Sequence, residues 1–191
     1  MIIGISGRMG TGKDTLGDMI LKLKPEFEKK GFSDKLKTIG HLLSGIPVKK
    51  FNSQNFKKEM MPKEWDWDGD PDDPMTVREF LQNLGTDAIR EAVHEDAWVI
   101  ALMSQYKIEE PKEVLPNWVI ADVRFPNEAE AIRKEGGILI RINRKIAKPD
   151  THDSELAMND YGNWHEIYDN DYGLEELEKF AKLIVDKYVK E

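Results

Sequence analysis

The clearest hydrophobic pattern in the chain is a short apolar run that stops at glycines and is followed by a helical repeat. The run Met1-Ile-Ile-Gly-Ile-Ser6 has the continuous apolar character of a strand buried on both faces in a parallel sheet. From Lys13 to about Lys22, apolar residues recur three or four positions apart, as in an amphipathic helix. This segment is therefore predicted to form a strand, a glycine loop and a helix.

Similar blocks of apolar and polar positions return along the rest of the chain. Strands are expected at 27–32, 117–124, 137–142 and 166–169, and helices at 95–106, 127–134 and 174–189. A further helix is expected to begin after the N-cap candidates Ser33 and Asp34 and to end near 45–47. Because strands alternate with helices, the pattern predicts an α/β fold with a parallel sheet.

A helix cap and a helix break are predicted in the region between the second and third strands. Thr76 is a favourable N-cap residue for the helix that follows it. Gly85 or Thr86 is expected to end that helix before a second one at 88–93. The acidic, proline-bearing stretch 65–74 is expected to be a loop, and no role is assigned to it.

Composition narrows the classes of function. The 191-residue chain has a formal net charge of −8, so the basic surface that binds long DNA or RNA is not evident. It contains no cysteine, which excludes disulfides and thiolate metal sites and favours a reducing compartment, with the cytoplasm as the expected location. No apolar run approaches the roughly 18 to 20 residues of a membrane-spanning helix, so we expect no membrane insertion.

The glycine loop carries the most specific chemical motif in the sequence. Gly7-Arg-Met-Gly-Thr-Gly-Lys13 matches the G-x-x-x-x-G-K pattern of a phosphate-binding loop. Placed between a strand and a helix, its N–H groups form an anion-binding nest, and the lysine reaches the β- and γ-phosphates. The residues predicted to bind ATP are Gly7, Arg8, Met9, Gly10, Thr11, Gly12, Lys13, Asp14 and Thr15.

Carboxylates near this motif suggest where Mg²⁺ binds. Asp14 stands where the pattern has Ser or Thr, and Thr15 follows it. Asp122 lies at the end of an apolar strand, where open α/β sheets place ligand chemistry. The predicted metal contacts are thus Asp14, Thr15 and Asp122, although Asp14 could equally serve only to favour the helix N-terminus. Arg124 and Glu128 follow the strand as candidate site residues or as a surface ion pair.

Several blocks together resemble the phage-type deoxynucleoside monophosphate kinases, in order and spacing across nearly the whole chain. They are Gly12-Lys-Asp-Thr15, Leu81-Gln-Asn-Leu-Gly-Thr-Asp-Ala-Ile-Arg90 with Trp98 beyond it, Ala121-Asp-Val-Arg-Phe-Pro-Asn-Glu128, and His152-Asp-Ser-Glu155. The glycine loop is shared by many NTPases, whereas the Gln, Gly-Thr and Arg block and the Asp-Val-Arg block are narrower.

The resemblance implies roles for residues outside the glycine loop. It implies that Lys13, Arg124 and Arg144 act on the transferred phosphoryl group, and that Arg141 lies just before the lid. The residues that it assigns to the acceptor nucleotide are Asp34, Lys37, Arg78, Gln82, Arg90, Arg124 and Glu128.

The resemblance also implies an architecture. We expect one domain with the three-layer P-loop NTPase fold, its core at about 1–32 and 117–191. A monophosphate-binding insertion is expected at about 33–92, and a lid at about 144–164.

The function expected from these features is transfer of the γ-phosphoryl group of ATP, with Mg²⁺, to a nucleoside or deoxynucleoside monophosphate. An already anionic acceptor needs no strong general base, which agrees with the absence of an evident one. Three alternatives remain: a P-loop kinase for dephospho-coenzyme A or another phosphorylated metabolite, a nucleotide-binding switch, and a degenerate P-loop protein with only a structural role, which Asp14 keeps open. The expected partners are therefore small nucleotides, with a homodimer as a further possibility and the host cytoplasm as the location if the source is viral.

Overall fold

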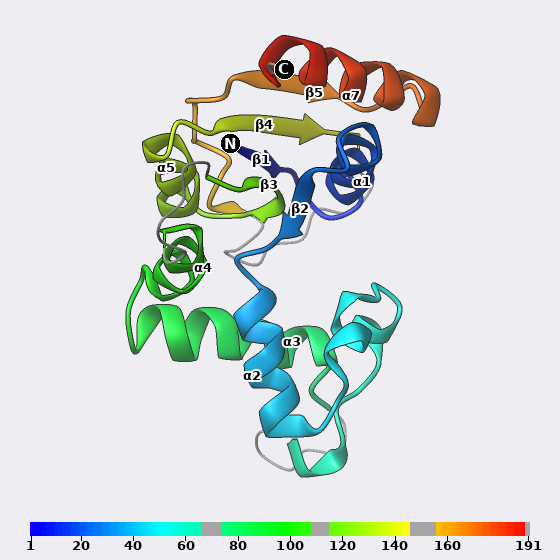
Figure 1. Cartoon of the computed structure of the whole chain (residues 1–191). Helices are drawn as coiled ribbons and strands as arrows, with labels where there is room; N and C mark the ends of the chain where they lie inside the picture. The colour runs from blue at the N-terminus through cyan, green and yellow to red at the C-terminus, as the bar shows by residue number, and fades with distance from the viewer. Residues whose placement is uncertain (66–73, 108–114, 146–155, 190–191) are drawn as a thin grey trace. The chain divides into compact units, whose positions relative to one another are not determined.

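The computed structural model describes residues 1–65, 74–107, 115–145 and 156–189, in an α/β arrangement (Figure 1). Its strands are β1 (Ile2–Ser6), β2 (Phe27–Lys30), β3 (Asn117–Val123), β4 (Ile138–Asn143) and β5 (Glu166–Asp169). Its α-helices are α1 (Lys13–Leu23), α2 (Asp34–Ser44), α3 (Val77–Gln82), α4 (Ala97–Lys107), α5 (Pro126–Lys134) and α7 (Leu174–Tyr188). The 3₁₀-helices are η1 (Val48–Asn52), η2 (Phe56–Lys58) and η3 (Lys63–Trp65), and η4 (Asn83–Glu91) is a π-helix.

The five strands form one sheet in the order β2-β3-β1-β4-β5, and every pairing is parallel. The predicted parallel sheet is confirmed, including the weakly patterned strand β2. Strand β1 lies in the middle, and all five of its residues are buried. A strand covered on both faces requires apolar side chains at successive positions, which is the pattern seen at 2–5.

Helices cover both faces of this sheet. On one face, Ile3 and Ile5 pack in a core cluster with α1 and α7. On the other, a Cβ built on Gly4 would lie 2.7 Å from the Cδ1 of Ile132 in α5, so the helix packs closely against bare backbone there. The α/β architecture therefore has three layers, as expected.

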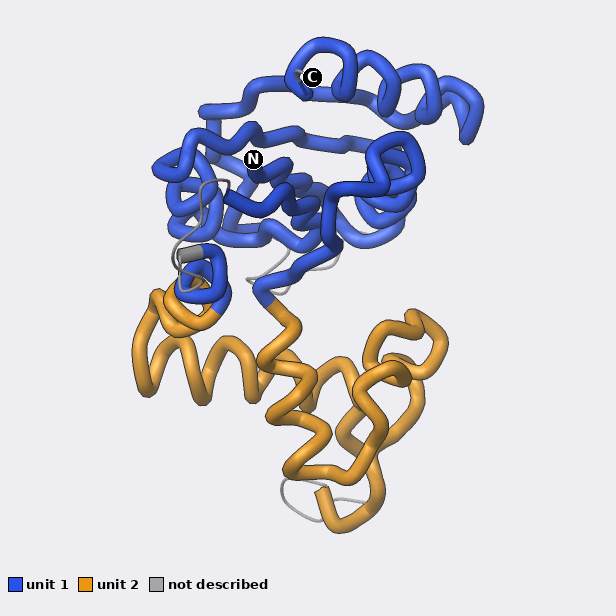
Figure 2. The backbone as a smooth tube through the Cα atoms, in the orientation of Figure 1, with its two compact units in different colours: residues 1–32, 102–191 blue, residues 33–101 orange. Residues whose placement is uncertain are grey.

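The chain divides into two compact units (Figure 2). The first comprises 1–32 and 102–191 and contains the sheet, and the second comprises 33–101. The second unit has its own small core of five buried apolar residues: Phe51, Met61, Val77, Phe80 and Leu81. Its expected role as a monophosphate-binding insertion stays a prediction, and residues 146–155 of the expected lid lie outside the described residues.

The predicted helix cap at Thr76 is confirmed, and the predicted helix break at Gly85 or Thr86 is wrong. The Thr76 side chain accepts a hydrogen bond from the N–H of Glu79, and the Glu79 carboxylate accepts one from the N–H of Thr76, which forms a capping box. The helix does not end at Gly85 or Thr86 but continues as η4 to Glu91. A Cβ at position 85 would lie 2.8 Å from Leu36 Cδ2, so the glycine permits close packing there.

The start of α2 and the acidic stretch 65–74 are two further places in the second unit for which expectations were stated. Ser33 precedes α2 as expected, but its side chain makes no capping hydrogen bond to the helix. The acidic stretch 65–74 falls mainly on 66–73, outside the described residues. Across the described part of the chain, none of the helices combines the length and apolarity needed to cross a membrane.

Candidate active site

The carboxyl ends of three neighbouring strands meet beside the glycine loop. Ser6, the last residue of β1, is in register with Val123 of β3 and with Arg141 of β4. Because all these strands are parallel, the loop after β1 lies at the same edge as the segments that follow β3 and β4. This edge is where open α/β sheets bind ligands.

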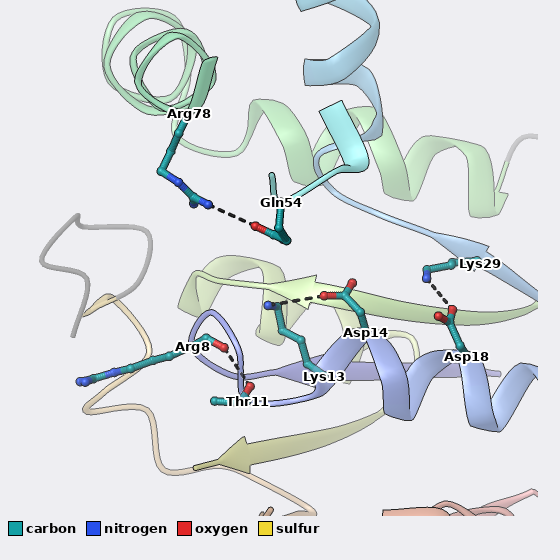
Figure 3. A network of polar contacts seen from close by, with 8 residues as sticks. All are labelled: Arg8, Thr11, Lys13, Asp14, Asp18, Lys29, Gln54 and Arg78. Carbon is teal, nitrogen blue, oxygen red and sulfur yellow. Dashed lines mark hydrogen bonds and ion pairs between the residues drawn. The ribbon is translucent and has the colours of Figure 1, made fainter. Parts of the chain in front are cut away.

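The loop between β1 and α1 has the backbone conformation of an anion-binding nest. Gly10 and Gly12 have φ angles of 81° and 98°, in the left-handed region that favours glycine. Thr11 closes the loop by donating from both Oγ1 (2.8 Å) and N (3.3 Å) to the carbonyl oxygen of Arg8 (Figure 3). Since α1 begins at Lys13, the positive end of the helix dipole adds to the N–H groups of the loop.

Lys13 is the buried cation of this loop. Its side chain is 7% exposed, and its Nζ lies 3.7 Å from Oδ2 of Asp14 (Figure 3). The Asp14 side chain is 60% exposed in the first turn of α1, where a carboxylate is favoured by the helix dipole. A lysine in this position, largely removed from water beside the N–H groups of the loop and the start of a helix, is suited to hold a bound anion.

Three arginines lie close to β1 or to the glycine loop that follows it, residues 7–13, which we call the phosphate loop. Arg144 Nη1 lies 3.5 Å from the carbonyl oxygen of Gly10, and Arg141 Nη1 donates to Ser6 Oγ at 3.0 Å. Arg8, within the loop, donates from Nη2 to Oδ1 of Asn159 at 3.0 Å. Guanidinium groups bind phosphate oxygens in a bidentate way, so this edge of the sheet is suited to a polyphosphate.

The predicted metal contacts occupy two places at this edge. Asp14 and Thr15 stand in the first turn of α1, and Asp122 is the penultimate residue of β3. Asp122 Oδ1 accepts a hydrogen bond from the N–H of Phe32 at 3.1 Å, which ties the end of β3 to the segment after β2. Among the described residues, no three His, Asp or Glu side chains are grouped closely enough to hold a metal by themselves. Mg²⁺ bound to ATP does not require such a group, since one or two carboxylates, the phosphates and water complete its shell.

Glu128 and Arg124 are joined through the backbone. Glu128 is only 3% exposed, and its Oε2 accepts hydrogen bonds from the N–H groups of Arg124 (2.8 Å) and Phe125 (3.2 Å). The carboxylate therefore shapes the turn between β3 and α5. Its expected contact with the acceptor stays a prediction, as does that of the Arg124 side chain.

The remaining residues assigned to the acceptor lie in the second unit. Asp34 and Lys37 form an ion pair at 3.6 Å on α2, and Arg78 Nη2 donates to Gln54 Oε1 at 3.1 Å (Figure 3). Arg78 and Gln82 are four residues apart on α3, so they share a face of that helix.

Arg90, on the continuing helix η4, is already engaged within the second unit. Its side chain is 8% exposed, and its Nη1 donates to the carbonyl oxygen of Glu95 at 2.7 Å. Nearby, Trp98 Nε1 donates to the carbonyl oxygen of Gly85 at 2.8 Å. These two bonds tie η4 to the segment that follows it, and a direct contact of Arg90 with a nucleotide stays a prediction.

One residue that touches the phosphate loop was not found from the sequence. Asn170 follows β5 and donates from Nδ2 to the carbonyl oxygen of Thr11 at 2.8 Å. The two residues are 159 positions apart, so no local pattern links them. The position of Asn170 just beyond the carboxyl end of a predicted strand is the one signal that could have singled it out.

Comparisons with known proteins agree with this chemistry. The family model for deoxynucleotide monophosphate kinase matches residues 45–180. A protein of Acanthamoeba polyphaga mimivirus, provisionally named a deoxynucleotide monophosphate kinase, is 29% identical over 185 residues, which cover 93% of this chain and 92% of the relative. The deoxynucleoside-5′-monophosphate kinase of Escherichia phage T5 is 40% identical over 60 residues, or 31% of this chain and 22% of that protein.

Among solved structures, a dephospho-CoA kinase from Campylobacter jejuni aligns with 97% of this chain and 96% of its own. Its sequence identity is 12% and its TM-score 0.45, too distant a likeness to bear on the function. The family match, by contrast, spans well over half of the chain and includes the strand end with Asp122 and Arg124. The chain therefore belongs to the deoxynucleotide monophosphate kinase family.

Proposed function

We propose that this protein transfers the γ-phosphoryl group of ATP to a deoxynucleoside monophosphate, giving ADP and the deoxynucleoside diphosphate. The observation that carries the proposal is the buried Lys13 in a glycine loop between β1 and α1. The family match limits the acceptor to the class that the family name describes.

The donor is expected to bind with its phosphates in the loop. N–H groups of the nest and the ammonium group of Lys13 would hold the β- and γ-phosphates. Arg144 would stabilise negative charge that shifts during transfer, a role supported by the position of its guanidinium beside the Gly10 carbonyl. Little covalent chemistry is required, since the acceptor oxygen is already anionic near neutral pH.

Mg²⁺ would enter with ATP, and its chemistry is to neutralise charge on the β- and γ-phosphates. Asp14 fits this use because its carboxylate is exposed next to Lys13, in the first turn of α1. Asp122, near the end of β3, is the second carboxylate proposed to contact the metal or a metal-bound water, in addition to the hydrogen bond that it accepts from Phe32 N–H.

Binding of the acceptor is assigned to the second unit and to the segment after β3. Arg78 and Gln82 supply a guanidinium fork and an amide from one helix face, suited to a phosphate and to the edge of a base. The lid expected at 144–164 and a cytoplasmic location complete the proposal.

The test is a coupled assay of ADP release with Mg²⁺ and ATP, run with each common nucleoside and deoxynucleoside monophosphate and with dephospho-coenzyme A. We expect turnover that depends on a deoxynucleoside monophosphate and that falls at least ~1,000-fold in Lys13→Ala, a loss of about 4 kcal/mol of transition-state stabilisation. Lys22→Ala, which removes an exposed lysine at the other end of α1, is the matched control and should retain full activity.

Each outcome separates the proposal from its alternatives. Turnover with dephospho-coenzyme A alone would assign another acceptor, and ATP hydrolysis that needs no acceptor would favour the nucleotide-binding switch. Removal of Mg²⁺ with EDTA should stop the reaction, and Asp14→Asn or Asp122→Asn should raise the Mg²⁺ concentration required for half-maximal rate.

A further inference from the structure

A buried asparagine holds one peptide group of the phosphate loop in place. Asn170 is 6% exposed, and its Nδ2 donates a 2.8 Å hydrogen bond to the carbonyl oxygen of Thr11. Its Oδ1 is the one buried side-chain polar atom in the described part of the chain that has no hydrogen-bond partner. An unpaired buried acceptor is unfavourable, so an amide at this position needs a compensating role.

The planarity of the peptide bond converts this contact into a constraint on the nest. The carbonyl of Thr11 and the N–H of Gly12 belong to one trans peptide group and point in opposite directions. A donor that holds the carbonyl on the side of Asn170 therefore directs the Gly12 N–H to the opposite side. No residue in the described ranges accepts a hydrogen bond from that N–H, which leaves it for a ligand.

This peptide group would otherwise be free to rotate. It joins Thr11 to Gly12, so its rotation changes the φ angle of Gly12, which is 98° here, and glycine adopts several backbone conformations with little difference in energy. Gly12 also approaches Asn170 closely, because a Cβ on Gly12 would lie 2.5 Å from Asn170 Nδ2. The bare backbone at Gly12 thus allows the amide to reach the loop.

Asn170 itself is fixed by the sheet. Its own N–H donates to the carbonyl oxygen of Asn143 at the end of β4, at 2.8 Å. The next residue, Asp171, accepts a hydrogen bond at Oδ1 from the N–H of Lys145 at 3.2 Å. The turn after β5 is therefore anchored to the end of β4, and the amide extends from this anchor to the loop after β1.

We infer that Asn170 is a positioning residue for ATP binding: its amide fixes the Thr11–Gly12 peptide so that the Gly12 N–H faces the bound phosphates. The inference rests on the proposed function for the identity of the ligand, but not for the conformation of the loop. Its prediction is a loop that is already arranged for phosphate before any nucleotide binds.

The first experiment examines the loop without a ligand. Backbone amide NMR of the whole chain is compared between wild type and Asn170→Ala, in which the backbone hydrogen bond to Asn143 is retained. We expect Gly12 and its neighbours to show microsecond-to-millisecond exchange in the variant and not in the wild type. An unchanged loop in Asn170→Ala would overturn the inference, whether or not the protein is a kinase.

The second experiment measures affinity for Mg·ATP and for inorganic tripolyphosphate by calorimetry. Loss of one side-chain hydrogen bond should weaken both ligands by about five- to tenfold in Asn170→Ala. The Michaelis constant for the monophosphate acceptor should stay within about twofold of the wild-type value. General destabilisation of the protein would not weaken ATP binding while leaving acceptor binding unchanged. Equal affinity of variant and wild type would refute the inference, whereas failure of the wild type to bind ATP would refute the proposed function.

Two further variants sharpen the result. Asp169→Ala removes an exposed hydrogen bond to Asn143 at the same strand end without touching the loop, and it should bind ATP as wild type does. Asn170→Asp keeps the size of the side chain but lacks the donor unless the new carboxyl is protonated. Its ATP affinity, relative to wild type at each pH, should recover as the pH falls, and a constant ratio would contradict the proposed hydrogen bond.

Discussion

Replacement of Gly12 by alanine should lower stability for two reasons, backbone strain and a steric clash with Asn170. A comparison with a second glycine at positive φ separates the two effects. At φ 98° an alanine is strained by about 1–2 kcal/mol. Its Cβ would also lie 2.5 Å from Asn170 Nδ2, so the amide must move and its hydrogen bond to Thr11 is lost, which costs about 1 kcal/mol more. We expect Gly12→Ala to reduce the free energy of unfolding by about 2–3 kcal/mol.

Gly136→Ala is the matched control for the backbone strain. Gly136 has a φ of 73°, belongs to the same unit, and a Cβ there would meet nothing within 4 Å. The loss of stability in this variant should therefore be limited to about 1–2 kcal/mol. The change in unfolded-state entropy is the same for both substitutions, so it cancels in the comparison.

Urea denaturation followed by circular dichroism, together with Mg·ATP calorimetry, measures both effects. Gly12→Ala should be less stable than Gly136→Ala by about 1 kcal/mol and should lose most of its ATP affinity, whereas Gly136→Ala should bind normally. Equal destabilisation of the two variants, with ATP affinity intact in both, would refute the argument that Asn170 and Gly12 form one closely packed unit.

Two more predictions concern stability away from the phosphate loop. Thr76→Ala should destabilise the second unit by about 1 kcal/mol, seen as a lower urea midpoint, because it removes the capping box with Glu79; an unchanged midpoint would show that the cap contributes nothing. Hydrogen bonds from Lys187 and Tyr188 lower the pKa of Glu166 below its usual value, so its contribution to stability is present above the unfolded-state pKa and is lost as the pH falls through the folded-state pKa. Thermal melts of Glu166→Gln should accordingly show a smaller fall in midpoint between neutral and acidic pH than wild type, and parallel curves would contradict this assignment.

The strand, loop and helix around Lys13 could be predicted because their signals are local. A buried parallel strand needs consecutive apolar residues, and a tight phosphate nest needs glycine, so both are written into neighbouring positions. The wrongly predicted break at Gly85 shows the limit of such signals. Glycine there serves close packing against Leu36, and tertiary contact outweighs the helix-breaking tendency of one residue.

The supports of the site could not be predicted from neighbouring residues. Asn170 reaches Thr11, and Arg141 reaches Ser6, only because parallel strands bring distant segments to one edge of the sheet. The hydrogen bonds from two backbone N–H groups to the Glu128 carboxylate were also not predicted, while its expected contact with the acceptor stays a prediction. A buried carboxylate that shapes a turn and one that binds a ligand look alike in a sequence.

The central place of β1 has a consequence for how the protein is made. Strand β1 pairs with β3 and β4, whose residues follow it by more than a hundred positions, while the unit at 33–101 is continuous in sequence. During synthesis the continuous unit can fold as soon as it emerges, but the unit that contains the sheet must keep an apolar strand unpaired until β3 is complete. Long-range pairing of this kind folds slowly, so the strand that leads into the glycine loop stays exposed to aggregation or chaperone capture in the growing chain.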